Sequence, residues 1–182
     1  KNWTVMNPEI IGRKLLDGIN IEVYRGEILG IAGLMGAGRT EFAMSLFGCL
    51  TPTNDSELVV KGESIKIKNP RQAIESGIGY VSEDRKRYGL VLRQNIKKNM
   101  SLASMDSMAR FGAINKNLEI TTAQQYVNDL RIKARNIDQT AETLSGGNQQ
   151  KVILSKWILT KPDILILDEP TRGIDVGAKF EI

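Results

Sequence analysis

A glycine-rich stretch followed by a short apolar run and two acids restricts the fold of this chain more than any other feature. Residues Leu144–Lys151 read LSGGNQQK, and the apolar run Ile164–Leu167 ends in Asp168 and Glu169. Ser145 and the two glycines predict the start of a helix, whose free N–H groups and positive dipole end can face a phosphate. The apolar run predicts a strand, covered on both faces, that delivers both carboxylates to the sheet edge where ligands bind in open α/β folds.

A second glycine-rich segment indicates what the ligand is. Residues 33–40 read GLMGAGRT and fit the phosphate-loop pattern G-x-x-x-x-G-K-[ST], except that Arg39 replaces the lysine. The apolar segment Ile28–Ala32 predicts a strand before the loop, and Glu41–Phe47 predicts a helix after it, which is the context that the motif requires. The N–H groups of such a loop form an anion-binding concavity, and the Thr40 hydroxyl is placed to ligate Mg2+. A planar guanidinium does not replace a compact ammonium, so we expect nucleotide binding here without fast hydrolysis.

These motifs occur in the order and spacing of the ATP-binding-cassette ATPases, and the chain resembles that family over nearly all of its length. Within the family, the wording GLMGAGRTE, YVSEDRKRYG, LSGGNQQKV and DEPTRGIDVGAKFEI resembles the second cassette of bacterial monosaccharide importers of the ribose, galactose and xylose type. The resemblance implies a C-terminal cassette taken from a longer fused chain, and the absence of an initiator Met at Lys1 agrees with this. It implies a RecA-like α/β fold with an antiparallel β layer and a helical subdomain, truncated at its C-terminus.

The sequence pattern fits a single cassette of this kind. Residues 1–94 and 161–182 are expected to form the β layer and the nucleotide core, and residues 95–160 the helical subdomain with the signature motif. The expected strands of the β layer are Trp3–Val5, Ile19–Val23 and Leu58–Ile67, with a core strand at 78–81. The expected helices are 71–76 after Pro70, several between Asn95 and about Leu130, and Gln149–Thr160.

The resemblance carries roles onto matching positions of this sequence. Asp168 is expected to hold Mg2+ and Glu169 to polarise the attacking water, with Thr40 and Glu83 as further Mg2+ ligands. Glu83 stands where the family usually has a glutamine, and Asp175 matches the loop that crosses the dimer interface. The expected phosphate-binding residues are Gly33, Gly36, Ala37, Gly38, Arg39 and Thr40, and the signature that acts on the partner's ATP comprises Leu144, Ser145, Gly146, Gly147 and Asn148.

The same resemblance implies that the chain couples ATP binding and hydrolysis to monosaccharide import at the cytoplasmic face of a bacterial membrane. Its partners are then a second cassette, either N-terminal in the same polypeptide or on another chain, and membrane permease subunits. A periplasmic or extracellular sugar-binding protein takes part indirectly. The basic segment Ser82–Gln94 is expected to dock the membrane subunit. The family's switch histidine would lie beyond Ile182, so the isolated chain is expected to be inactive.

Two other functions remain compatible with a cassette. A soluble ATPase acting on ribosomes or DNA predicts inserted basic or zinc-binding segments, whereas the chain has one cysteine, Cys49, and no histidine. Its net charge of +4 comes from basic residues spread along the chain without interleaved aromatics, so no nucleic-acid partner is expected. A regulatory cassette that binds nucleotide without hydrolysing it is the other alternative, which Arg39 and Glu83 favour.

Overall fold

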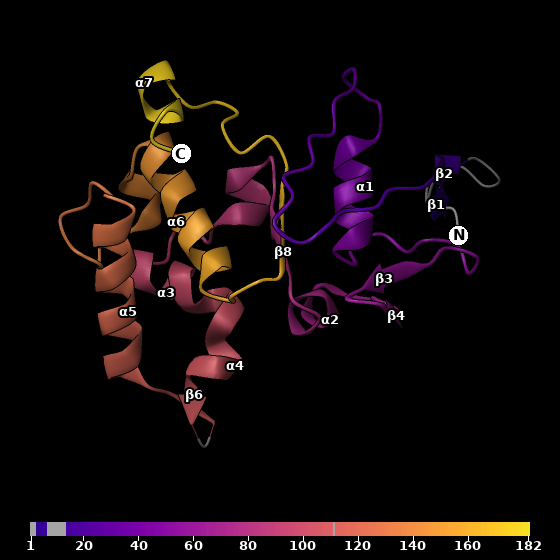
Figure 1. The fold of residues 1–182 in the computed structure, drawn as a ribbon. Coiled ribbons are helices and arrows are strands. Elements are labelled where there is room, and N and C mark those ends of the chain that lie inside the picture. Colours follow the sequence, from indigo (N-terminus) through magenta and orange to yellow (C-terminus); the bar gives the residue numbers. More distant parts are fainter. Residues whose placement is uncertain (1–2, 7–13, 111) are drawn as a thin grey trace. The chain divides into compact units, whose positions relative to one another are not determined.

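The computed structural model describes residues 3–6, 14–110 and 112–182 (Figure 1). The chain divides into two compact units, Lys1–Ile78 and Gly79–Ile182. Each unit has buried apolar side chains of its own. The boundaries expected for a nucleotide core and a helical subdomain at 95–160 differ from those of the two units. That division stays a prediction.

The first unit contains the predicted antiparallel β layer. Strand β1 (Trp3–Met6) pairs with β2 (Lys14–Ile19), and β3 (Leu58–Val60) pairs with β4 (Glu63–Ile65). The turn between β3 and β4 places Lys61 and Gly62 at φ 54° and 84°, as a two-residue hairpin of right-handed twist requires. The strand predicted at Ile19–Val23 is wrong, because β2 ends at Ile19.

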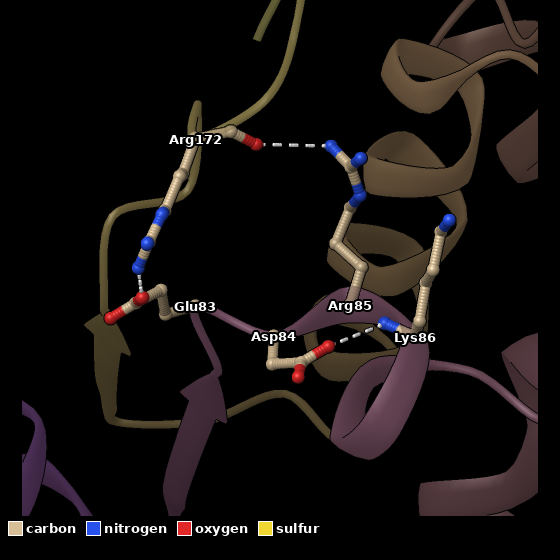
Figure 2. A pocket seen from close by; sticks show the side chains of 5 residues that line it. All are labelled: Glu83, Asp84, Arg85, Lys86 and Arg172. Atoms are coloured by element: carbon tan, nitrogen blue, oxygen red, sulfur yellow. Dashed lines mark hydrogen bonds and ion pairs between the residues drawn. The ribbon is translucent and has the colours of Figure 1, made fainter.

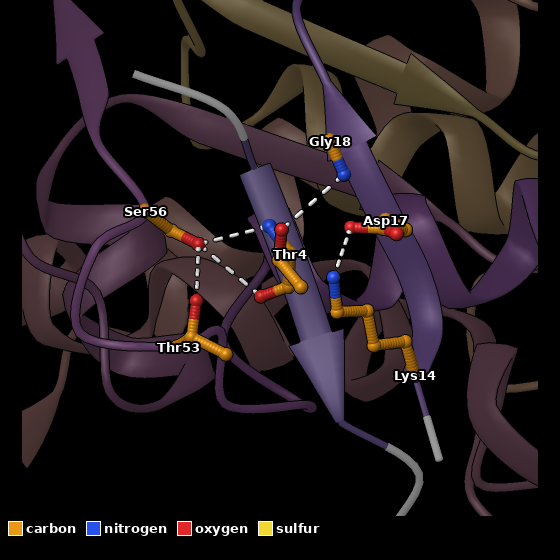
Figure 3. A network of polar contacts seen from close by, with 6 residues as sticks. All are labelled: Thr4, Lys14, Asp17, Gly18, Thr53 and Ser56. Atoms are coloured by element: carbon orange, nitrogen blue, oxygen red, sulfur yellow. Dashed lines mark hydrogen bonds and ion pairs between the residues drawn. The ribbon is translucent and has the colours of Figure 1, made fainter. Parts of the chain in front are cut away.

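Burial of Leu16 explains why β2 lies at Lys14–Ile19 and not at the predicted range. Leu16 packs with Trp3 and Val5 in the core of the first unit, and Val5 is its Cα partner across the ladder. The hydroxyl of Ser56 adds a polar link on the other side of β1, where it accepts from the Thr4 backbone N–H at 2.9 Å (Figure 3). The buried side chains thus align β2 through residues that precede the predicted range.

Two helices complete the first unit. Helix α1 (Arg39–Leu46) overlaps the predicted helix Glu41–Phe47 but begins at Arg39, and the Trp3 indole donates to Ser45 on it at 2.8 Å. Helix α2 (Pro70–Glu75) is close to the prediction, because Asn69 accepts from the backbone of its first turn at 3.0 Å and Gly77 follows it at φ 79°.

The strand predicted at Ile28–Ala32 is wrong. These residues form no strand in the described structure, and the side chains of Ile28, Leu29 and Ile31 are 98%, 41% and 48% exposed. A buried strand needs hydrogen-bonded neighbours and cover on its faces. The described strands of the first unit pair only among themselves, so they provide no neighbour for this segment.

Strand β5 (Ile78–Val81) begins at the boundary of the two units and pairs with β8 (Ile164–Leu167) as a two-stranded sheet. Both strands match their predicted ranges. All of β5 is buried, but Ile164, Leu165 and Leu167 of β8 are 39%, 37% and 49% exposed. The expected cover on both faces of β8 is therefore wrong, because alternate side chains point to opposite faces and exposed ones occur on both.

Helices are the main regular elements of the second unit. Helix α3 (Ile96–Ser101) packs against both α5 (Lys116–Asp129) and α6 (Gly146–Ile158) (Figure 1). Between α3 and α5 lie a 3-10 turn (Leu102–Ser104), α4 (Met105–Met108) and a hairpin of β6 (Ala109–Arg110) and β7 (Ala113–Ile114). The remaining elements are a π-helical turn η1 (Arg85–Gly89), a 3-10 turn (Ala141–Thr143) and α7 (Val176–Lys179). Across the described ranges, no helix is long and apolar enough to cross a membrane.

Candidate functional site

The loop before α1 contains a tight turn and leads directly into the helix. The N–H of Ala37 donates to the carbonyl of Leu34 at 3.0 Å, and α1 begins directly after Gly38, which has φ 84°. Within the described part of the chain, no side chain caps this helix end. A Cβ on Gly38 would lie 2.6 Å from Cδ2 of Leu16, so both the φ angle and the packing on β2 require glycine. The loop and helix start offer the positive end of α1 to a ligand.

The predicted phosphate-binding residues line this turn. A Cβ on Gly33 would lie 3.1 Å from Cβ of Ala37 and 3.6 Å from Cδ of Arg39, so the loop closes on itself at this point. Gly36 has φ 81° and an open surrounding, which leaves space beside its backbone. Arg39 and Thr40 are half-buried at the start of the helix.

The acid pair lies at the end of β8, and its two carboxylates have different surroundings. Asp168 is buried, its backbone N–H donates to Val81 on β5 at 2.9 Å, and its Oδ2 accepts from the Tyr80 hydroxyl at 3.0 Å. Glu169 is exposed and has φ 43°, a left-handed conformation that is uncommon outside glycine. Sequence reasoning missed Tyr80, although it carries the one side-chain hydroxyl in the apolar strand IGYV.

Glu83, the other predicted Mg2+ ligand of this unit, forms an ion pair with Arg172 (Figure 2). Both residues line a cavity of about 260 Å³ together with Asp84, Arg85 and Lys86. Sequence reasoning missed Arg172, because the ion pair joins two segments that are far apart along the chain.

The signature begins α6 as predicted. Ser145 is the N-cap residue, and its hydroxyl oxygen accepts from the side-chain amide of Asn148 at 2.8 Å. The side-chain carbonyl of Asn148 in turn accepts from the backbone N–H of Lys133 at 2.8 Å. Leu144 is buried, so it anchors the signature in the core while Gly146 and Gly147 lie in the first turn of the helix. The first turn of α6 is thus fixed from both sides.

The structure brings the signature and the predicted interface residue Asp175 to one open cavity of about 320 Å³. Lys151 is buried at its wall and donates to Oε2 of Glu181 at 2.6 Å. This hydrogen bond and the charge of Lys151 lower the pKa of the Glu181 carboxyl. The lining residues are Lys133, Ser145, Gly147, Asn148, Lys151, Asp175, Gly177 and Glu181.

The oxygen donors of the predicted Mg2+ ligands suit that ion. Mg2+ takes hydroxyl, carboxylate and water oxygens, which Thr40, Glu83 and Asp168 would provide together with a nucleotide. Thr40 belongs to the first unit and the two acids to the second. No group of three or more His, Cys, Asp or Glu residues that could hold a metal occurs among the described residues, so a nucleotide's phosphates would have to complete the coordination.

A family model described as ABC transporter matches residues 16–172, a range that contains the phosphate loop, the signature and the acid pair. The chain belongs to the ABC transporter family. This membership confirms the resemblance inferred from its motifs.

Curated relatives match the cassette closely. It is 52% identical over its whole length to the xylose import ATP-binding protein XylG of Thermoanaerobacter pseudethanolicus and to the L-arabinose transport ATP-binding protein AraG of Geobacillus stearothermophilus. It is 50% identical, over 94% of its length, to a putative ribose/galactose/methyl galactoside import ATP-binding protein of Albidiferax ferrireducens. The cassette spans 36% of each of the first two relatives and 34% of the third.

Solved structures confirm the predicted fold class. The whole cassette matches 78% of the dimeric structure of MJ0796, a bacterial ABC transporter cassette, with a TM-score of 0.80 at 20% identity. It also matches 78% of a post-hydrolysis dimer of MJ0796 bound to ADP and Pi, with a TM-score of 0.79 at 22% identity. The RecA-like α/β core with its β layer and helices is the fold of these cassettes.

Proposed function

We propose that the cassette binds MgATP and couples its binding and hydrolysis to monosaccharide import, as one domain of a longer ATP-binding protein. The observation that carries the proposal is that the phosphate loop, acid pair and signature all lie within a chain about half identical to three sugar transport ATP-binding proteins. The cassette spans about a third of those relatives, which supports a second cassette in the same polypeptide.

In this proposal the phosphates bind at the loop Gly33–Thr40. The turn at Ala37 and the uncapped start of α1 support this role, because backbone N–H groups and the helix dipole both favour an anion there. The glycines at 33, 36 and 38 let the backbone approach the phosphates closely. Arg39 supplies positive charge with a forked, planar geometry that differs from lysine.

The acid pair would carry the chemistry. Asp168, oriented by the Tyr80 hydroxyl, would hold Mg2+ with Thr40 and Glu83, and the ion would neutralise charge on the transferred phosphoryl group. Glu169 would act as the general base that polarises the attacking water. Its exposure supports this role, because an exposed carboxylate at the end of the strand can reach a water that Asp168 cannot.

The signature would act on the ATP of the partner cassette. The start of α6, with the Ser145 hydroxyl and two glycines, presents backbone N–H groups and the positive end of the helix, as phosphate binding requires. Asp175 lines the same cavity, which supports its role in the loop that meets the partner. Since the signature is intact and Arg39 alters the phosphate loop, we infer that this cassette serves mainly as the donor of the signature, while its own loop holds a slower or structural nucleotide.

The remaining parts of the proposal concern partners and organisation. The segment Ser82–Gln94 follows β5 and carries the turn η1, and we propose that it docks the membrane permease at the cytoplasmic face of the membrane. We further propose that residues 95–160 work as a helical subdomain of a cassette whose nucleotide core comprises 1–94 and 161–182. A sugar-binding protein outside the membrane would act on the cassette only through the permease.

ATP hydrolysis by the longer protein, purified with its permease, tests the proposed function. We expect MgATP hydrolysis by the wild-type complex, and we expect Glu169→Gln to remove the part of it that this cassette's own, slower site contributes, since the base acts in the transition state. Glu142→Gln is the matched control, because Glu142 is also exposed and lies outside the proposed machinery. Equal hydrolysis by both variants would contradict the assignment of the base, and an unreactive wild-type complex would contradict the proposed activity.

A further inference from the structure

The turn η1 is fixed on α6 at several points. The carboxylate of Asp84 accepts from two backbone N–H groups of the turn, at 3.1 and 3.0 Å. The ammonium of Lys156 on α6 donates to the carbonyl of Gly89. A Cβ on Gly89 would lie 2.6 Å from Cδ1 of Ile153, so the turn packs tightly on the helix. The backbone of Arg85, the first residue of η1, therefore has a defined position relative to α6.

The guanidinium of Arg85 extends from this turn to two other segments. Its Nη1 donates to the backbone carbonyl of Arg172 at 3.1 Å, as Figure 2 shows. Its Nη2 lies 3.2 Å from the position that a Cβ on Gly146 would take, and 3.7 Å from that of a Cβ on Gly173. Because Gly146 and Gly173 are glycines, the planar guanidinium of Arg85 has room beside them. One side chain thus lies beside the first turn of α6 and binds the turn that follows the acid pair.

Helix stability does not explain this placement, because a cation at the N-terminal end of α6 opposes the helix dipole. Two residues of the segment 83–85 instead bind Arg172. Glu83 pairs with its side chain, and Arg85 binds its backbone carbonyl. Arg87, two positions further, differs from Arg85 because its guanidinium lies 5.1 Å from the ring centre of Tyr88, on the same turn.

We propose that Arg85 is a positioning residue that holds the start of the signature helix and the Thr171–Gly173 turn in one fixed arrangement. The signature residues Ser145–Gly147 and the interface residue Asp175 would then meet the partner's nucleotide together. This inference rests on the proposed function for its consequence in catalysis. It also gives the segment Ser82–Gln94 a physical connection, through Arg85, to both parts of the cassette that face the partner.

Steady-state ATP hydrolysis by the longer protein assembled with its permease gives the first test. We expect Arg85→Ala to lower kcat by about tenfold or more and to leave the KM for ATP within about twofold, because misplacement affects the transition state more than ground-state binding. Arg85→Lys keeps the charge but lacks the fork, so it should recover only part of kcat. Arg71→Ala is the matched control, because Arg71 pairs with Glu75 on the exposed side of α2 in the first unit, and it should hydrolyse ATP as the wild type does.

Three outcomes of this test would overturn the inference. One is a kcat for Arg85→Ala equal to that of Arg71→Ala. Another is a raised KM with kcat retained, which would make Arg85 a nucleotide contact. The third is full recovery by Arg85→Lys, which would show that charge alone suffices.

Hydrogen exchange on the 182-residue chain gives a second readout, which does not require hydrolysis. The N–H of Arg172 donates to the carbonyl of Glu169 at 3.0 Å, and the N–H of Ile174 donates to that of Thr171 at 3.3 Å. We expect both amides to exchange about fivefold faster in Arg85→Ala than in Arg87→Ala, since the lost hydrogen bond restrains this turn. Equal exchange in the two variants would overturn the inference. A different combination of results would overturn the proposed function alone. In it, Arg85→Ala exchanges faster in the 182-residue chain, but the wild-type complex does not hydrolyse ATP.

Discussion

Lys156 makes the free energy of unfolding of the second unit rise with pH. Its side chain is buried on α6, where the ammonium donates to the carbonyl of Gly89 and lies 5.0 Å from the ring centre of Trp157. Burial lowers the pKa of Lys156 from 10.5 to about 8, because the charged form loses its hydration. The hydrogen bond survives deprotonation, since a neutral amine still donates.

The sign and size of the effect follow from this lowered pKa. Below about pH 8 the amine is charged in both the folded and the unfolded chain, so the whole cost of burying the charge is present. Between about pH 8 and pH 10.5 the unfolded chain binds more protons, so the free energy of unfolding rises with pH. At about 1.4 kcal/mol for each pKa unit, the complete shift corresponds to about 3 kcal/mol.

Urea unfolding of the wild-type chain and of Lys156→Met measures this term. The methionine keeps the length of the side chain and removes its titration, while every other titrating group is shared. Far-ultraviolet circular dichroism follows mainly the second unit, which contains most of the helices. We expect the stability of the wild type relative to Lys156→Met to rise by about 3 kcal/mol between about pH 7 and pH 10.5.

Lys98→Met is the matched control, because Lys98 is exposed on α3. Its stability relative to the wild type should stay constant over the same pH range. A wild-type stability relative to Lys156→Met that does not change between pH 7 and pH 10.5, or that falls, would refute the argument from burial.

Three further substitutions test separate parts of the site. Tyr80→Phe removes the donor to the buried carboxylate of Asp168 and should lower the free energy of unfolding by about 1–3 kcal/mol in urea titrations; an unchanged value would contradict the hydrogen bond. Gly38→Ala combines a positive φ with a steric clash, so nucleotide titration monitored by fluorescence should show weaker binding by about tenfold or more, and wild-type affinity would contradict the loop geometry. In the assembled transporter at saturating ATP, Ser145→Arg should lower hydrolysis more than Arg39→Ala, and equal losses would contradict the proposed asymmetry between loop and signature.

Local signals predicted several elements well, because the residues that decide them are neighbours in the sequence. Asn69 and Pro70 mark the start of α2, and Gly77 allows the positive φ just after it. The same holds for the signature helix, whose first residue follows the N-cap Ser145. Capping and backbone preferences act within one helical turn, so they can be identified from the sequence alone.

The wrong predictions concern strands, whose formation depends on distant partners. Ile28–Ala32 has the composition of a buried strand, yet in the first unit no described strand pairs with it, and its side chains are exposed. Packing of Leu16 against Trp3 and Val5 decides where β2 lies. The lack of a paired strand and the packing of Leu16 both depend on residues outside the predicted segments.

The chemistry of the site divides in the same way. The sequence identified Asp168 and Glu169 as a pair at a strand end, and the structure places them there. It could not predict the hydrogen bond from Tyr80, which spans 88 positions of the chain, or the ion pair of Glu83 with Arg172. Such contacts depend on which strands and turns become neighbours in the fold.

ATP-driven sugar uptake by proteoliposomes tests the central claim most directly. The longer protein that contains the cassette would be reconstituted with its permease and sugar-binding protein, and uptake of labelled xylose, arabinose, ribose and galactose would be measured with internal MgATP. We predict ATP-dependent uptake of at least one of these sugars, which Ser145→Arg abolishes and Glu142→Gln leaves intact. ATP hydrolysis without uptake of any of the monosaccharides, or uptake that Ser145→Arg does not affect, would contradict the account.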